Sequence, residues 1–129
     1  MIKEFNDMGI KVWDGTNTDV RTQYPVELNQ HRLLQYESCR GLEGWTVVCL
    51  DFDEFIKYKM DYYIEEETNE LGLETFEEKR NKFVYLWSII PLTRAIESLI
   101  ITIADKESDV CKTLRKVYEE NPDFIQWIE

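Results

Sequence analysis

The chain has 129 residues, of which 43% are hydrophobic, and it carries a formal net charge of −11. This length supports one hydrophobic core and is too short for two, so residues 1–129 are expected to form a single domain. The apolar runs fall well short of the roughly 20 residues that span a bilayer, which excludes a membrane-spanning protein, and the acidic start of the chain favours a cytoplasmic protein over a secreted one.

The first 30 residues predict one short helix and one short strand. Residues 2–8 have a helical pattern, and Gly9 suits the C-terminal cap of that helix. Residues 10–13 alternate like a strand, and residues 14–19 are rich in turn formers. No strong period follows up to Asn29, so this stretch is expected to be a loop with one helical turn.

Three further segments predict strands, at residues 32–36, 46–50 and 99–103. The last two are continuous apolar runs, which are typical of strands covered on both faces in a parallel sheet. Helical stretches separate the strands, and parallel neighbours need crossover connections of this kind. The pattern therefore predicts an α/β fold with a mostly parallel sheet.

Two helices are predicted between the second and third of these strands. The first covers residues 53–63. The second begins at Thr75-x-x-Glu78, a capping box in which each side chain can bond to the other residue's backbone N–H. Pro91 lacks an amide donor and is expected to kink or end this helix. The residues of the second helix that share one face, and are expected to pack on the core, are Phe76, Phe83, Trp87 and Ile90.

The C-terminal part predicts two more helices. Ser108 or Asp109 can cap the first, and residues 121–123 end it. Residues 124–128 are expected to form another short apolar helix, whose aromatic side chains either close the core or cover a partner. The expected buried stripe of the longer helix consists of Val110, Leu114 and Val117.

The charges are spread unevenly along the chain. Residues 51–78 hold most of a dense acidic block, whereas Arg21, Arg32 and Arg40 precede it. Because affinity for nucleic acid comes largely from Lys and Arg, the net charge weakens a DNA contact on one face without excluding it. Residues 65–67, all glutamates, are expected to be a solvated loop, because no further ligand spacing supports a cation.

The cysteines and the single histidine offer no clear reactive site. Cys39, Cys49 and Cys111 are widely spaced and lack a CxxC pair or a histidine cluster, which argues against a zinc site or a disulfide framework. They are expected to be reduced and mostly buried. His31 has no nucleophile motif beside it and is expected to be an ordinary surface or edge histidine. No metal site is predicted.

Two motifs occur in order, and each precedes an apolar strand. Residues 38–43 (S-C-R-G-L-E) resemble motif V of UvrD/Rep-like superfamily 1 DNA helicases, whose usual form is S-x-K-G-L-E. Residues 92–95 (L-T-R-A) are similar to the end of the family's motif VI, V-x-x-T-R-A. Residues 77–80 (E-E-K-R) resemble the family's E-E-x-R run, and residues 1–15 look like the segment that follows motif IV. The resemblance is clear from about residue 33 to residue 106.

The resemblance implies the second RecA-like motor lobe of such a helicase. It implies a single α/β lobe with a mostly parallel sheet of about four or five strands flanked by helices, similar to P-loop NTPases but without the P-loop. It also implies that Arg94 is an arginine finger for ATP held between two lobes, and that Glu43 bonds the ribose from a turn that requires Gly41. By the same resemblance, Ser38 and Arg40 lie near the backbone of single-stranded DNA.

Each of these assignments has a plain structural alternative. The guanidinium of Arg94 stays charged and offers a planar fork of donors, which suits a γ-phosphate, but it could instead pair with Glu97 on the next turn. Glu43 could be a strand-edge carboxylate, and Ser38 could be a local turn cap. Thr93 is expected to orient the Arg94 turn rather than to touch ligand.

The chain also departs from the family's pattern. Glu37 stands where the family usually has a histidine three residues before the basic residue of motif V, which sets a carboxylate beside an expected phosphate. Pro91 beside motif VI, and a longer spacing between residues 77–80 and Thr93, make the approach to Arg94 unusual.

The sequence lacks a G-x-x-x-x-G-K-[ST] loop and an acidic Walker B strand, both of which belong to the first lobe. The chain alone is therefore expected to be inert, with ATP and Mg²⁺ bound only in an assembled two-lobe protein. The expected partners are a first lobe with a Walker A loop, in the same or a separate polypeptide, and single-stranded DNA. The chain is expected to be a piece of a longer protein.

Two other interpretations stay open. One is a degenerate, non-enzymatic lobe that acts as a protein-interaction or regulatory module, which the net charge and Glu37 favour. The other is a small α/β domain in which the two motif matches are accidental.

Overall fold

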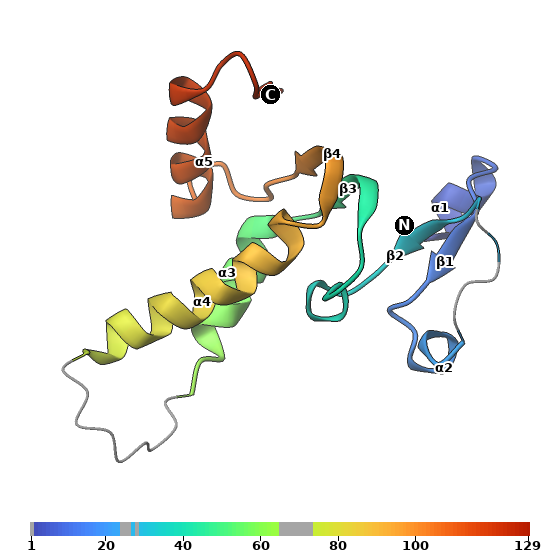
Figure 1. Ribbon diagram of the computed structural model, residues 1–129, viewed down its shortest axis with the longest axis horizontal. Coiled ribbons are helices and arrows are strands. Elements are labelled where there is room, and N and C mark those ends of the chain that lie inside the picture. Colours follow the sequence, from blue (N-terminus) through green and yellow to red (C-terminus); the bar gives the residue numbers. More distant parts are fainter. Residues whose placement is uncertain (1, 24–26, 28, 65–73) are drawn as a thin grey trace. The chain divides into compact units, whose positions relative to one another are not determined.

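The computed structural model describes residues 2–23, 27, 29–64 and 74–129. These residues form helices and short parallel strands, so the predicted α/β class is confirmed (Figure 1). The described strands make two separate two-stranded parallel sheets, and the single larger sheet stays a prediction. The chain divides into two compact units, Met1–Gly41 and Leu42–Glu129, and each is described by itself. The predicted glutamate loop at residues 65–67 lies outside the described residues.

The first unit begins with the predicted helix and cap. Helix α1 (Ile2–Asp7) ends at Gly9, whose φ of +75° lies in the left-handed region that favours glycine. The N–H of Gly9 donates to the carbonyl of Asn6 at 3.0 Å, and the N–H of Ile10 donates to that of Phe5 at 2.9 Å. These two bonds form a Schellman motif, which satisfies carbonyls that the helix end would otherwise leave unpaired.

The rest of the first unit is a parallel strand pair joined by a short helix. Strand β1 (Val12–Asp14) pairs with β2 (His31–Leu33), and α2 (Thr18–Arg21) lies in the connection, as the single expected helical turn. Gly15 is buried after β1, where an added Cβ would meet the Trp13 ring and would lie 2.7 Å from Leu34 Cδ2. Only glycine fits this position without a shift of those side chains.

Strand β2 ends earlier than the predicted strand at 32–36. A 3₁₀ turn, η1 (Tyr36–Ser38), takes up the end of that segment, because the N–H of Ser38 donates to the carbonyl of Gln35 at 2.9 Å. The sequence pattern at residues 32–36 could not distinguish a strand from a shorter strand followed by this turn. His31 is exposed on β2, as expected.

The second unit contains the longer parallel pair. Strand β3 (Gly44–Cys49) pairs with β4 (Ala95–Ile101), with Val47 opposite Leu99 and Val48 opposite Ile100. Paired residues of a parallel sheet point to the same face. Val48 and Ile100 are 50% and 49% exposed, so their face is open to solvent.

The prediction that these strands are covered on both faces is therefore wrong for the described residues. The reason is that the helices of this unit pack mainly on one another, α3 (Phe52–Asp61) against both α4 (Phe76–Leu92) and α5 (Asp109–Glu120). A continuous apolar run indicates that a strand can be covered, but it does not supply the covering element.

Helix α4 begins at the predicted capping box. Thr75 Oγ1 accepts from the N–H of Glu78 at 3.2 Å, and the Glu78 carboxylate accepts from the N–H of Thr75 at 2.7 Å. The helix ends at Leu92, one residue after Pro91, which agrees to within one residue with the predicted end. Pro91 lies in the last turn, where it removes one backbone donor, and the N–H of Thr93 still donates to the carbonyl of Ile89 at 3.1 Å.

The hydrophobic core lies in the second unit. Among the described residues its buried members are Cys49, Phe52, Phe55, Ile56, Val84 and Cys111. Of the face predicted for α4, Phe83 and Trp87 pack together at a ring separation of 6.2 Å, whereas Phe76 is half exposed. The fully buried side chain of α4 is Val84, three positions before Trp87, so the buried side of the helix lies beside the predicted face and overlaps it.

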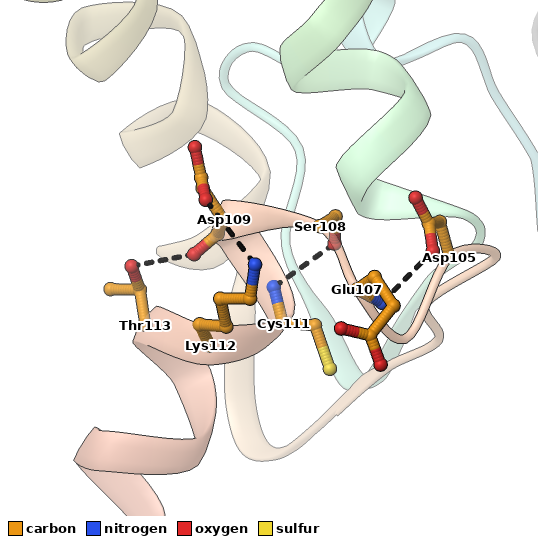
Figure 2. A network of polar contacts seen from close by, with 7 residues as sticks. All are labelled: Asp105, Glu107, Ser108, Asp109, Cys111, Lys112 and Thr113. Carbon is orange, nitrogen blue, oxygen red and sulfur yellow. Dashed lines mark hydrogen bonds and ion pairs between the residues drawn. The ribbon is translucent and has the colours of Figure 1, made fainter.

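Helix α5 has the predicted N-cap. Ser108 Oγ accepts from the N–H of Cys111 at 3.2 Å, and Asp109 pairs with Lys112 at 3.8 Å (Figure 2). The predicted stripe is only partly buried, because Val117 is exposed and the inward residue of the first turn is Cys111.

The predicted helix at 124–128 is wrong. The N–H groups of Phe124 and Ile125 both donate to the carbonyl of Asn121, which makes a turn, and the chain is irregular beyond it. Trp127 lies over α5, with its ring 6.0 Å from that of Tyr118. In the described part of the chain, no helix combines the length and the apolar character needed to cross a membrane.

Candidate functional site

Arg94 lies at the junction between α4 and β4 and is partly buried. Its Nη2 donates to Thr93 Oγ1 at 3.0 Å, while Thr93 Oγ1 itself donates to the carbonyl of Ile89 at 2.8 Å. Thr93 therefore holds one end of the guanidinium, and the expectation that it orients the Arg94 turn rather than touching ligand stays a prediction. The Nε of Arg94 is buried and has no hydrogen-bond partner among the described residues. A partly buried guanidinium with an unused donor is suited to an anionic ligand.

The alternative pairing of Arg94 with Glu97 is not found. Glu97 lies on β4 and not on a helical turn, and none of the ion pairs among the described residues includes Arg94. The alternative assumed that a helix continued past Thr93. The strand starts at Ala95 and extends this part of the backbone instead.

Glu43 and Arg94 stand before neighbouring parallel strands. The N–H of Gly44, at the start of β3, donates to the carbonyl of Arg94 at 3.1 Å, and Gly44 pairs with Ala95. The two candidate nucleotide-binding residues therefore lie at the same amino-terminal edge of the β3–β4 sheet. Glu43 is exposed there, where its carboxylate is accessible from solvent.

Gly41 adopts a φ of +78°, and an added Cβ would meet no atom within 4 Å. The space is free, so the requirement for glycine comes from the left-handed backbone alone. The turn at Gly41, within residues 38–43, thus needs glycine, as the resemblance implies.

Ser38 and Arg40 belong with Gly41 to the first unit, whereas Glu43 and Arg94 belong to the second. Ser38 Oγ accepts from Arg21 Nη1 at 3.2 Å, and Arg40 is exposed. The structure therefore brings Glu43 and Arg94 to one sheet edge, and it brings Ser38 beside an arginine of α2. Sequence reasoning named Arg21 only as one of three arginines that precede the acidic block, because a contact across 17 positions leaves no periodic signal.

Asp53, on the first turn of α3, is a polar residue whose role the sequence did not reveal. Its carboxylate accepts from the N–H groups of Ala104 and Asp105, both at 2.9 Å, and its side chain is only 5% exposed. Burial raises the pKa of Asp53, but the hydrogen bonds from these amides and from the first turn of its own helix lower it more, so the pKa lies below its ordinary value. Asp53 ties α3 to the loop after β4, which is a structural role.

No group of three or more histidine, cysteine or acidic side chains is arranged for a metal ion within the residues that the structure describes. The run at residues 77–80 forms the first turn of α4, where Arg80 lies over the Phe76 ring at 5.9 Å. Cys49 and Cys111 are buried and Cys39 is partly buried, so the prediction that the cysteines are mostly buried is confirmed, and no disulfide joins these three residues.

Comparisons with protein families, with curated proteins and with solved structures find no match to this chain. We therefore infer the function from the motif residues, their order along the chain, and the geometry at the start of the β3–β4 sheet.

Proposed function

We propose that this chain is the second RecA-like motor lobe of a cytoplasmic, ATP-dependent DNA helicase or translocase of the UvrD/Rep-like kind. In this proposal Arg94 is the arginine finger of an ATP site shared with a first lobe, and Gly41 and Glu43 form the turn that contacts the ribose. Ser38 and Arg40 belong to the track for single-stranded DNA. The first lobe supplies the Walker motifs that hold ATP and Mg²⁺.

The observation that carries the proposal is the pairing at the start of the β3–β4 sheet. The bond from Gly44 to the carbonyl of Arg94 joins two segments that lie far apart in the sequence, and these are the two segments that resemble motifs V and VI. The order helix, Thr93-Arg94, strand also agrees with the arrangement that the resemblance implies.

The chemistry of Arg94 fits the proposed role. Phosphoryl transfer is accelerated by positive charge placed on the γ-phosphate oxygens, and an arginine supplied from across a cleft can provide it. The unpartnered Nε and the Nη2 held by Thr93 leave the guanidinium oriented but not neutralised among the described residues. Such a group can sense whether a γ-phosphate is present.

The proposal includes a single parallel sheet of four or five strands. Support comes from the parallel pairing within each two-stranded sheet, and the open aliphatic face at Val48 and Ile100 favours a further layer packed on that face. A two-stranded sheet is marginal in water, and exposed β-branched side chains on it favour a larger covered sheet in the assembled protein.

The test is to measure ATPase activity of this chain together with its first lobe. Arg94→Ala is expected to reduce turnover by roughly 10³-fold or more, with the circular dichroism spectrum unchanged. Arg115→Ala is the matched control, because Arg115 is an exposed arginine of the same unit that pairs with Glu129 at 3.1 Å. The chain alone is expected to show no turnover of ATP. Full activity of the Arg94→Ala protein, or turnover by the chain alone, would refute the assignment.

A second candidate is a degenerate lobe that serves as a protein-interaction or regulatory module. The observation that favours it is charge: residues 42–129 hold ten Lys and Arg against twenty Asp and Glu, a net charge of −10. Such a surface repels DNA and suits a basic protein partner. The sequence adjoining this chain in its gene distinguishes the two, because only a motor requires a Walker A loop there.

A further inference from the structure

Arg21 lies beside the motif V serine through a contact that only the fold creates. It ends the short helix α2, and its Nη1 donates to Ser38 Oγ at 3.2 Å. Both residues belong to the first unit. The hydroxyl of Ser38 accepts this bond, so its own hydrogen is left to donate to another oxygen.

The charge of Arg21 is not neutralised by a carboxylate among the described residues. Lys11 of the same unit, in contrast, pairs with Glu27 at 3.2 Å. Arg21 is exposed, and a guanidinium carries five N–H donors in a planar fork that matches the oxygens of a phosphate. One donor holds Ser38, and the others can reach a ligand.

We propose that Arg21 is a further phosphate-binding residue of the single-stranded DNA track, acting beside Ser38 and Arg40. This inference rests on the proposed function and extends it. Arg21 also adds a positive charge beside Ser38, the residue that follows Glu37 in the sequence. The guanidinium of Arg21 and the hydroxyl of Ser38 contact the same phosphate or adjacent phosphates.

The test is the salt dependence of binding to a labelled oligo-dT, measured by fluorescence anisotropy with the full chain. For single-stranded nucleic acid, each phosphate contact contributes about 0.7 to the slope of log K against log salt concentration. Arg21→Ala is expected to weaken binding several-fold at low salt and to reduce the slope by about 0.7. Arg21→Lys keeps the charge and is expected to restore most of the slope but not all of the affinity.

Arg32→Ala is the matched control, because Arg32 is also an exposed arginine of the first unit and makes no contact with Ser38 among the described bonds. It is expected to change the slope less than Arg21→Ala does. A purely structural role for Arg21 would lower the melting temperature and leave the slope unchanged, which overturns the inference. Equal effects of the two alanine variants also overturn it, since they reveal only general charge attraction.

Failure of the proposed function gives a different result. If the unaltered chain and the chain assembled with its first lobe both fail to bind oligo-dT at low salt, the DNA track itself is wrong and this inference falls with it. Binding that Arg21→Ala leaves intact refutes only the role of Arg21.

Discussion

The two units of the chain are held together in different ways. Every buried hydrophobic residue among the described residues lies in Leu42–Glu129, whereas in Met1–Gly41 the buried residue is Gly15. The first unit depends on a Schellman motif, a capped turn and three-residue strands. The second has apolar side chains that leave water on folding, which is the larger stabilising effect.

The units also differ in charge. Residues 1–41 carry five Lys and Arg and six Asp and Glu, a net charge of −1, and the remaining −10 of the total −11 belongs to residues 42–129. The candidates for DNA contact lie in the nearly neutral unit. The net charge of the whole chain is therefore a poor guide to whether this part of it can bind a phosphate backbone.

The largest expected effect comes from separating the units. A fragment of residues 42–129 is expected to unfold cooperatively in urea, because it keeps the entire described core, whereas a fragment of residues 1–41 is expected to show no cooperative transition. Chains of roughly 40 residues rarely fold without disulfides or metals. Circular dichroism at increasing urea concentration measures the unfolding transition of each fragment. A cooperative transition in the shorter fragment would remove the contrast between the units.

Within the second unit, Asp53→Asn is expected to lower the free energy of unfolding at neutral pH by about 3 kcal/mol, because a buried charge-assisted acceptor of two loop amides is lost. The pKa of Asp53 in the folded protein lies below its ordinary value, so its stabilisation is complete above the unfolded pKa and declines as the pH falls through the folded one. The difference in free energy of unfolding between the unaltered protein and the Asp53→Asn variant should therefore shrink below about pH 4. Urea titrations at pH 7 and pH 3 measure this difference, and an equal difference at both pH values would contradict the assigned role of the Asp53 carboxylate.

Val84→Ala tests the core itself. Val84 is 2% exposed, and its truncation is expected to cost about 2 kcal/mol through lost burial and the cavity that remains. Leu86→Ala, on the exposed side of the same helix, is the matched control and is expected to change stability by less than about 0.5 kcal/mol. A comparable loss from both variants would mean that the open side of α4 is covered in solution.

The smallest effect is expected in the first unit. Gly9→Ala should cost about 1 kcal/mol, because alanine is strained at a φ of +75° although no atom lies within 4 Å of the added Cβ. Gly9→Asn should cost less, since asparagine tolerates this region. Amide hydrogen exchange of α1 measures the loss locally. An equal loss of protection in α3 would show that the two units unfold together.

Features that depend on neighbours along the chain were predicted correctly from the sequence. The Thr75 and Glu78 box, the Ser108 cap and the glycine cap at Gly9 each join residues no more than a few positions apart, so a short stretch determines them. The left-handed turn at Gly41 belongs to the same class. The helix predicted at 124–128 was wrong because a short apolar run is compatible with a turn that packs its Trp127 on another helix.

By itself, the sequence determined the α/β class, most helix starts, and the two motifs on which the proposed function depends. Only the tertiary structure decided that Gly44 pairs beside Arg94, that Asp53 holds the loop at Ala104, and that Arg21 reaches Ser38. It also decided which apolar residues stay exposed on β3 and β4. These contacts join residues far apart in the chain. Which of them form depends on how the whole unit packs, and a short stretch of sequence does not determine that.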